Sequence, residues 1–270
     1  MRKDYIPVAD EARTADETSF VEKYWTDVWT RHDQAPDLSA LARREEYRVI
    51  RPFLSTLPRG SRILDAGCGL GEWTLFLGQQ GLDAVGLDLS GDIIARLKER
   101  FPASQFVRGD IRRTGFEAGS FDACLSWGAF EHFENGIGDC LDEAHRILRP
   151  GGWLFISVPF HNGRLLARDA HPLEHWDENF DAHAGYRQSQ RFYQWRFTRP
   201  ELKRELELHG FHTRLITPIH KLQGAGRWLQ WDFRVCRPNT RAYFALRRLS
   251  AAVLPASYVS HMLLAVAERR

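Results

Sequence analysis

Three glycines at alternating positions, Gly67, Gly69 and Gly71, follow a strand pattern at 62–66 and precede a helical pattern that starts at Glu72. Glycine adopts positive φ angles without strain and lets a ligand come close to backbone N–H groups. The helix that follows presents its amino end to the same ligand. A strand, a glycine turn and a helix in this order predict an α/β domain that cradles a nucleotide-type cofactor.

The spacing of these glycines excludes a dinucleotide fingerprint. G-x-G-x-x-G requires a sixth residue that is glycine, and here that residue is Glu72. An acidic side chain in the loop repels a pyrophosphate but is tolerated beside a cation. The loop therefore favours a cofactor that lacks phosphates.

The 270 residues are long enough for one large α/β domain with additions. Apolar runs and turn residues predict strands at 62–66, 83–88, 104–109, 121–127, 153–158, 211–216 and 261–267. Helical spacing predicts helices near 17–32, 38–54, 72–80, 91–101, 138–148 and 198–210. This alternation predicts a doubly wound, mostly parallel seven-stranded sheet.

The same patterns divide the chain. The expected parts are an N-terminal helical cap at 1–58, a core at 59–217 with an acceptor-side segment at 160–197, a helical insert at 218–260 and the final core strand at 261–270. Regularity lapses over 160–197, and the insert is longer than an unstructured loop of a compact domain.

Composition limits the function classes. The net charge of +2 implies no nucleic-acid partner, and four cysteines without a C-x-x-C pair predict neither a metal site nor a disulfide framework. We read no export signal or membrane span, so a cytoplasmic location is expected.

Five motifs in order resemble class I S-adenosylmethionine-dependent methyltransferases, of the type that acts on small molecules or lipids. They lie at 64–71, 86–90, 107–111, 121–126 and 148–154. The resemblance implies a Rossmann-like methyltransferase fold and S-adenosyl-L-methionine as the cofactor.

Strand-end residues fit that cofactor. Asp88 lies about twenty residues beyond the glycine loop, where a carboxylate can take both hydroxyls of a ribose. Asp110 would accept the exocyclic amine of adenine, while Leu89 and Ile111 clamp the ring. Asp65 and the glycine backbone would face the cationic methionine part.

The expected cofactor set is completed by Gly67, Cys68, Gly69, Gly71 and Trp127. The alternative is that these residues are ordinary strand-end polar groups and turn glycines. A shared ligand at the carboxyl edge of the sheet explains them together.

Glu131 and His132 follow the fourth core strand and resemble the Glu-His pair of small-molecule O-methyltransferases. His132 could take a proton from a hydroxyl as the methyl group leaves sulfur. Alternatively, both residues only cap the next helix or bond locally. The Asn/Asp-Pro-Pro-aromatic motif of base-methylating members is missing from residues 126–133.

Histidine and aromatic residues crowd the segment after the fifth strand, which could line an acceptor pocket. They are His161, His171, His175, His183, Trp176, Tyr186, Phe192, Tyr193 and Trp195. Residues 171–175 match H-x-x-E-H formally, but Pro172 disfavours the helix that this zinc motif requires, so we expect no metal.

The insert at 218–260 carries a single acid, Asp232, among its basic residues: Lys221, Arg227, Arg234, Arg237, Arg241, Arg247 and Arg248. Its apolar positions Ala242, Leu246, Leu249 and Val253 recur at helical spacing. A basic amphipathic helix is typical of peripheral contact with an anionic membrane, here the inner membrane surface. The alternative is a stripe packed on the core.

Aromatic residues of the first helix leave two interpretations open. Tyr24, Trp25 and Trp29 form a lid over the cofactor or attach the cap to the domain.

We therefore expect methyl transfer by direct displacement to a hydroxyl of a small or lipid-linked acceptor. The alternatives are N- or C-methylation of a small metabolite, a catalytically inactive cofactor-binding or interaction protein, and a nicotinamide oxidoreductase, which Glu72 disfavours.

Overall fold

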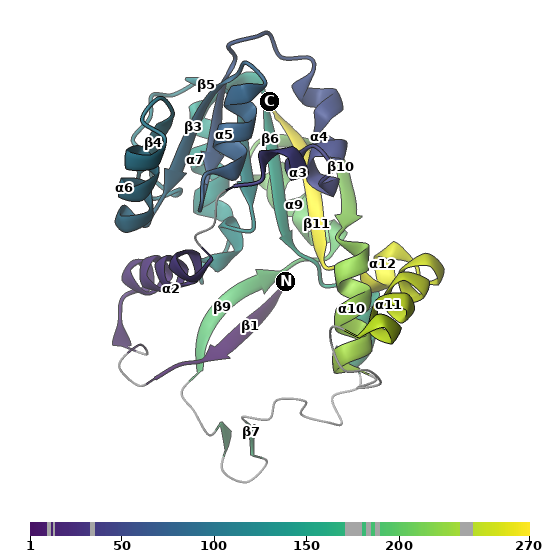
Figure 1. Ribbon diagram of the computed structural model, residues 1–270. Helices are drawn as coiled ribbons and strands as arrows, with labels where there is room; N and C mark the ends of the chain where they lie inside the picture. The colour runs from purple at the N-terminus through teal and green to yellow at the C-terminus, as the bar shows by residue number, and fades with distance from the viewer. Residues whose placement is uncertain are drawn as a thin grey trace.

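The protein is built around one seven-stranded sheet. The computed structural model describes residues 1–9, 12, 14–32, 36–170, 180–181, 185–186, 190–232 and 240–270. Across the sheet the order is β10 (Phe211–Ile219), β11 (Met262–Arg269), β6 (Leu148–Pro159), β5 (Phe121–Trp127), β2 (Arg62–Ala66), β3 (Asp83–Asp88) and β4 (Gln105–Arg108). Figure 1 shows these strands crossing the upper part of the molecule.

Most neighbouring strands run parallel. The pairs β2–β3, β3–β4, β2–β5 and β5–β6 are parallel, whereas β11 is antiparallel to both β6 and β10. The predicted doubly wound, mostly parallel seven-stranded sheet is confirmed. Strand β6 begins five residues before the predicted 153, because the turn Pro150–Gly152 is taken into the strand.

Helices cover both faces of the sheet because side chains along a buried strand alternate between faces. Leu64 lies in the cluster formed with α7 (Gly138–Ile147) and α9 (Arg199–Leu208). Its neighbour Ile63 lies in the opposite cluster with α3 (Leu38–Leu41), α4 (Glu45–Leu54) and α5 (Glu72–Gln79). Helix α6 (Gly91–Arg100) buries its own apolar stripe against Phe106 of β4.

The helix predicted at 38–54 is two helices. Arg44 has an extended backbone, with ψ of 148°, and precedes α4 as its N-cap, so the chain cannot continue helically from α3.

A two-stranded ribbon lies beside the sheet and was not predicted. Strand β1 (Arg2–Pro7) pairs antiparallel with β9 (Gln190–Arg196), so the expected cap at 1–58 is not helical throughout. The segment 160–197 likewise contains α8 (Gly163–Ala170), β9 and the short pair β7 (Phe180–Asp181) and β8 (Gly185–Tyr186). Asp4 joins the two strands of the ribbon by bonding Arg196 and Gln194.

The described residues of the insert include the helices α10 (Lys221–Trp231), α11 (Arg241–Val253) and α12 (Ala256–Val259), which lie beside the ribbon (Figure 1). Two glycines of α10 allow α11 and α12 to pack closely against it. A Cβ at Gly224 would lie 1.7 Å from the carbonyl oxygen of Val259, and one at Gly226 would lie 2.6 Å from the hydroxyl of Tyr243. Within the described residues, no helix combines the length and the apolar character needed to cross a bilayer.

Candidate functional site

A pocket of about 570 Å³ lies at the carboxyl ends of β2, β3 and β5, under helix α2 (Glu17–Arg31). Figure 1 shows α2 crossing below the ends of these strands. The wall is formed by Val21, Glu22, Trp25, Trp29, Gly67, Asp88, Leu89, Asp110, Ile111, Trp127, Gly128, Ala129, His132 and Phe133. Seven of the twelve site residues expected from the sequence are in this wall.

Asp88 is fixed at the end of β3 by backbone donors. The N–H of Gly69 donates to Oδ2 at 2.9 Å, and the N–H of Ser90 donates to Oδ1 at 3.0 Å. Burial raises the pKa of this carboxyl despite both bonds. A carboxylate has about four acceptor positions, so Asp88 keeps capacity for a ligand that brings its own hydroxyl donors.

The glycine loop is closed over by a tryptophan of α2. Gly69 has a φ of 50°, and a Cβ there would lie 2.9 Å from the ring of Trp29. Gly67 reaches the pocket wall, whereas Cys68, Gly69 and Gly71 lie behind it. Glycine at position 69 is required for two reasons, the positive φ and the contact with the indole.

Asp65 is also behind the wall, although we expected it to face the cofactor. Its Oδ2 accepts from the N–H of Thr74 at 3.0 Å and from the Thr74 hydroxyl at 2.7 Å. Burial raises the pKa of Asp65 to about 7. In this structure Asp65 ties the strand β2 to the first turns of α5 and so supports the glycine loop between them.

Asp110 lines the pocket but already has a cationic partner. Nε of Arg112 donates to Oδ1 at 3.1 Å and Nη2 donates to Oδ2 at 2.7 Å. The side-chain and charge interactions with Arg112 hold the pKa of Asp110 below its usual value, although burial opposes them. Arg112 also donates to Glu17 of α2 at 2.7 Å, so the same arginine fastens the helix over the pocket.

The chemistry of the wall suits a cationic, aromatic ligand. Three carboxylates, Glu22, Asp88 and Asp110, lie among the indoles of Trp25, Trp29 and Trp127, and no lysine or arginine of the described chain is in the wall. Indole faces attract cations. Nε1 of Trp127 is buried and has no acceptor in the described part of the chain, so it is available to a ligand.

These features fit S-adenosylmethionine and oppose a dinucleotide. Glu22 and Asp110 are already paired with Arg108 and Arg112. Asp88 forms no ion pair within the described residues, so its carboxylate favours a sulfonium or an ammonium and repels a pyrophosphate. Asp88 is placed for hydroxyl donors, and the free indole N–H of Trp127 suits an oxygen acceptor.

His132 lies in the wall on the 3₁₀ turn η1 (Phe130–His132). Its Nδ1 is 2.7 Å from the carbonyl oxygen of Tyr193 and therefore carries the proton, which leaves Nε2 as the acceptor in the neutral ring. Burial lowers the pKa of His132 to about 4, against the opposing backbone bonds to Tyr193 and Gly128. The imidazole is neutral at pH 7.

Glu131 lies behind the pocket wall. Burial raises its pKa to about 8, so the carboxyl holds a proton at pH 7, and its Oε2 has no hydrogen-bond partner. A protonated acid cannot act as the base, and its catalytic assignment stays a prediction.

Helix α2 is attached to the domain by polar contacts that sequence patterns did not indicate. Glu22 accepts from Arg108 at 2.9 Å, and Thr26 hydrogen-bonds Ser90 at 2.6 Å. The Trp25 ring packs edge-on against His132 at 4.9 Å between centroids. The amphipathic pattern of α2 signalled a buried face, but only the folded chain identifies what it covers.

Other expected acceptor residues lie outside this pocket. His161 bonds Asp169 at 2.8 Å, and Phe192 and Trp195 pack against each other in the ribbon. The structure does not describe His171, His175, Trp176, His183 or the side chain of Tyr186. Among the described residues, no group of histidine, cysteine or acidic side chains could hold a metal ion.

Residues 40–215 match the methyltransferase domain family, which covers about two thirds of the chain. The chain belongs to this family. The predictions of a class I S-adenosylmethionine-dependent methyltransferase, its fold and its cofactor are thereby confirmed.

Relatives of this methyltransferase domain differ in what their names say they methylate. It is 34% identical over 133 residues to a demethylmenaquinone methyltransferase of Beutenbergia cavernae, covering 48% of this chain and 54% of the relative. It is 36% identical over 147 residues to a tRNA (carboxymethyluridine(34)-5-O)-methyltransferase of Xenopus tropicalis, covering 53% of this chain and 21% of the relative. The chain thus spans about half of one relative and a fifth of the other.

The fold resembles a solved geranyl diphosphate methyltransferase in complex with S-adenosylmethionine. The TM-score is 0.55 with 17% identity, covering 83% of this chain and 84% of that one. At this identity the likeness concerns the fold alone.

Proposed function

We propose that this methyltransferase transfers a methyl group to a hydroxyl of a small or lipid-linked acceptor by direct displacement. The observation that carries the proposal is the closed pocket under α2, where carboxylates and indoles adjoin a neutral imidazole. This combination provides a place for a cationic methyl donor and a proton acceptor for a hydroxyl.

Six residues of the wall have a part in binding the cofactor in this proposal. S-adenosylmethionine supplies an electrophilic methyl group carried on a sulfonium. Asp88 binds hydroxyl groups, the Trp127 N–H binds an oxygen acceptor, and Leu89 and Ile111 provide apolar contact for a flat ring. Trp25 and Trp29 exclude water from the pocket, which strengthens the electrostatic interactions inside it.

His132 is the proton acceptor for the hydroxyl in this proposal. The carbonyl of Tyr193 fixes its tautomer and its ring orientation. Because the pKa is lowered, His132 is a weak base, and we expect alignment of the two reactants to supply most of the rate enhancement.

Calorimetry with S-adenosylmethionine, S-adenosylhomocysteine and NAD tests the cofactor pocket. We expect the first two to bind and NAD not to bind. Asp88→Ala should weaken binding of S-adenosylhomocysteine by roughly 1–3 kcal/mol, because a buried ligand hydroxyl loses its acceptor. The exposed Glu99→Gln is the matched control. Absence of binding by S-adenosylmethionine contradicts the proposal.

Labelling identifies the acceptor class. A cell extract is incubated with the protein and methyl-labelled cofactor, and the lipid, small-molecule and RNA fractions are analysed separately by mass spectrometry. Label in the lipid or small-molecule fraction supports the proposal. Label confined to RNA would instead agree with the tRNA-methylating relative and overturn it.

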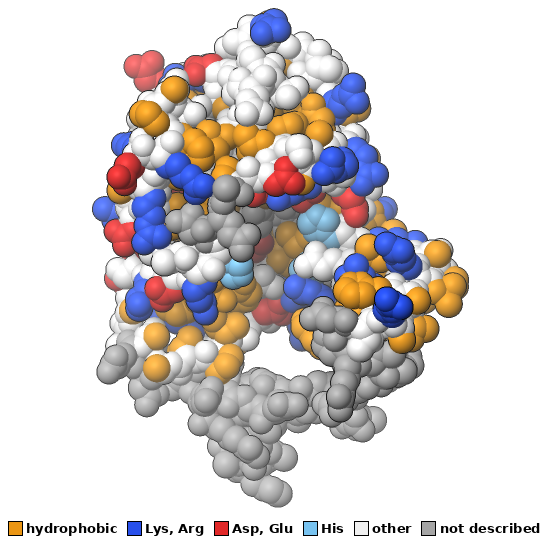
Figure 2. Space-filling model, viewed as in Figure 1, with side chains coloured by type: hydrophobic (Ala, Val, Ile, Leu, Met, Phe, Trp, Pro, Cys, Tyr) orange, Lys and Arg blue, Asp and Glu red, His pale blue; other side chains and the backbone are white. Residues whose placement is uncertain are grey.

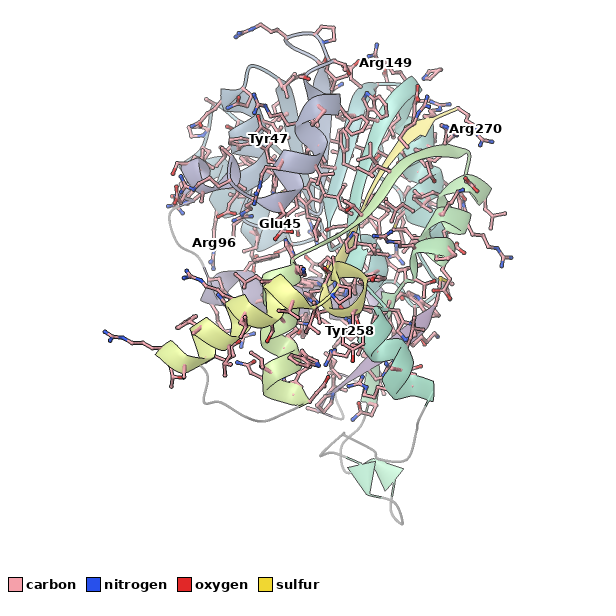
Figure 3. The ribbon with its side chains drawn as sticks, turned by 90° about the vertical axis from the view of Figure 1, so that its right-hand side faces the viewer. Glu45, Tyr47, Arg96, Arg149, Tyr258 and Arg270 are labelled. Carbon is pink, nitrogen blue, oxygen red and sulfur yellow. The ribbon has the colours of Figure 1, made fainter. Side chains whose placement is uncertain are left out.

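Peripheral contact with an anionic membrane is part of the proposal, and the exposure of α11 supports it. Leu249 and Val253 are 61% and 73% exposed, so the apolar stripe is not packed on the core among the described residues. Figure 3 shows α11 projecting from the body beside the labelled Tyr258 of α12. Figure 2 shows basic and apolar side chains adjacent over α10 and α11.

A further inference from the structure

A second, larger cavity lies between the ribbon, α8, α10 and α12. It measures about 2300 Å³ including its open mouth. Its basic side chains come from four separate elements: Arg2 and Lys3 of β1, Arg164 and Arg168 of α8, Arg196 of β9, and Arg227 of α10. Figure 2 shows a hollow in the middle of this face, with lysine or arginine side chains at its rim.

Acidic side chains pair with every one of these cations except Arg227. Arg196 pairs with Asp4 at 2.6 Å, and Arg164 pairs with Asp232 at 2.7 Å. Arg2 and Arg168 share Asp169, at 2.7 Å and 4.0 Å, and Lys3 pairs with Glu134 at 2.9 Å. Arg227 pairs with no carboxylate of the described chain. Its guanidinium lies over the Trp231 ring at 5.3 Å and donates from Nη1 to Nδ1 of His261 at 3.2 Å.

Burial makes the unused donors of these guanidinium groups costly. The side chain of Arg164 is only 8% exposed, and within the described residues its Nε has no hydrogen-bond partner. Burial lowers the pKa of Arg227, and the guanidinium groups of Arg196 and Arg164 lower it further. Buried cations of like sign that keep unused donors are expected where a negatively charged ligand completes them.

The cavity adjoins the cofactor pocket. Tyr193 lines the arginine side, and its ring lies 5.1 Å from that of His132, centroid to centroid. Its carbonyl is the group that fixes the tautomer of His132. A ligand held by the arginines is therefore separated from the transfer site by one side chain. Leu165 and Val259 give the same wall apolar surface.

We propose that this cavity binds the oxyanion of the methyl acceptor, so that the substrate is an organic molecule bearing a phosphate or a carboxylate group. Arg227 and Arg164 hold that group, and Arg196 supplies positive charge behind them. Guanidinium groups match the geometry of phosphate and carboxylate by paired N–H donors. The assignment of the bound oxyanion to the methyl acceptor rests on the proposed methyl transfer. Anion binding in the cavity can be tested without assuming methyl transfer.

The test measures binding of chosen probes to the full chain by calorimetry at constant ionic strength, without cofactor. The probes are octyl phosphate, octanoate and octyltrimethylammonium. We expect both anions to bind and the cation not to bind, and the tighter of the two anions identifies the group. Equal binding of the cation shows that apolar surface alone is responsible and overturns the proposal.

Two variants distinguish anion binding in this cavity from a general effect of the protein's positive charge. Arg227→Gln should weaken anion binding at least tenfold. Arg204→Gln, an exposed arginine on α9 outside the cavity, should leave it unchanged. Equal losses in the two variants, or none in Arg227→Gln, overturn the proposal. Arg164→Gln, which removes the second guanidinium group assigned to the anion, replaces Arg227→Gln if the latter does not fold.

The same samples are titrated with S-adenosylhomocysteine. Unchanged affinity in Arg227→Gln shows an intact fold and cofactor pocket, so that a loss of anion binding belongs to the cavity. If the wild-type protein binds the anions but not S-adenosylhomocysteine, the proposed function fails while the anion site stands.

Discussion

At the scale of single residues, two acidic side chains near the site have pKa values well above those of exposed carboxyl groups. Asp65 and Glu131 are both buried, with pKa values raised to about 7 and about 8. Asp65 has Thr74 as a donor for its carboxyl, whereas Oε2 of Glu131 has none. Their protonation therefore affects the stability of the fold around physiological pH.

The raised pKa of Asp65 predicts a pH-dependent stability. Its folded-state pKa of about 7 exceeds the ordinary aspartate value of 3.8, so the protonated form favours the folded state. The stabilisation is complete below about pH 4 and is lost as pH rises through about 7, amounting to roughly 4 kcal/mol at most. Asp65→Asn keeps an acceptor for Thr74 and should remove this loss.

Urea unfolding at pH 5 and pH 8 measures the effect. We expect Asp65→Asn to be more stable than the wild type at pH 8 and to lose less stability between the two values. Glu99→Gln is the exposed control. An Asp65→Asn protein with the wild-type pH dependence would show that Asp65 is ionised at both values.

His132 gives a second residue-scale prediction. With a pKa of about 4, it is neutral above pH 5 and can accept a proton. The rate of methyl transfer should rise as pH increases through about 4, where His132 loses its proton, and should stay constant from pH 5 to pH 8. His132→Ala should lower kcat by roughly 10²–10⁴-fold if it is the base.

The readouts for His132 are the pH–rate profile and the affinity for S-adenosylhomocysteine, which should change little. His212→Ala, an exposed histidine on β10, is the control. A loss of kcat smaller than about tenfold would leave alignment alone as the source of catalysis.

At the scale of elements, α2 is the helix that covers the cofactor pocket. None of its residues is fully buried, and it is held by partly exposed ion pairs to Arg112 and Arg108. Such pairs contribute roughly 0–1 kcal/mol each. The helix should therefore open locally at low cost in free energy.

Hydrogen exchange followed by mass spectrometry tests this opening. We expect amides of α2 to exchange faster than those of α7 in the free protein and to slow on addition of S-adenosylhomocysteine. Helix α9, which is distant from the pocket, is the internal reference. If the ligand leaves exchange of α2 unchanged, the helix does not gate the pocket.

At the scale of the whole molecule, the exposed side of α11 and the arginine-lined cavity lie toward the same end. Arg149 and Arg270 mark the opposite end of the sheet in Figure 3. A protein that contacts an anionic membrane through α11 would thus place the cavity mouth near the lipid headgroups.

Liposome flotation tests the membrane contact. Arg241→Glu with Arg248→Glu should abolish binding to anionic vesicles, because attraction to the surface is reversed. Arg59→Glu with Arg204→Glu makes the same change in net charge elsewhere and is the control. Leu249→Ser with Val253→Ser should also weaken binding. Equal flotation of all variants contradicts membrane contact through α11.

The core of the molecule was predictable because its signals are local. The turn after β2 is specified by glycines with positive φ at 67, 69 and 71. The strands are specified to within a few residues by apolar runs, which place alternate side chains on the two faces of the sheet. The strand ends then place Asp88, Asp110 and Trp127 at one edge.

The ribbon and the polar contacts of α2 were not predictable in this way. Asp4 meets Gln194 across 190 positions, and the pattern of residues 2–7 alone gives no sign of its partner. Glu22 and Phe133, which sequence patterns did not indicate, reach the site only through the packing of α2 and of the turn after η1. Tyr193 was expected near an acceptor, but its contact with His132 depends on the pairing of β9 with β1. Asp65 was placed on the correct strand, but its side chain turned toward Thr74 because α5 begins there.

The position of β11 has a consequence for how the protein is made. This strand follows every other strand of the sheet along the chain, yet it lies between β6 and β10. During synthesis, two strand edges therefore stay open until residues 262–269 leave the ribosome. Open edges recruit other chains, so a nascent protein stalled before residue 262 should be prone to aggregation.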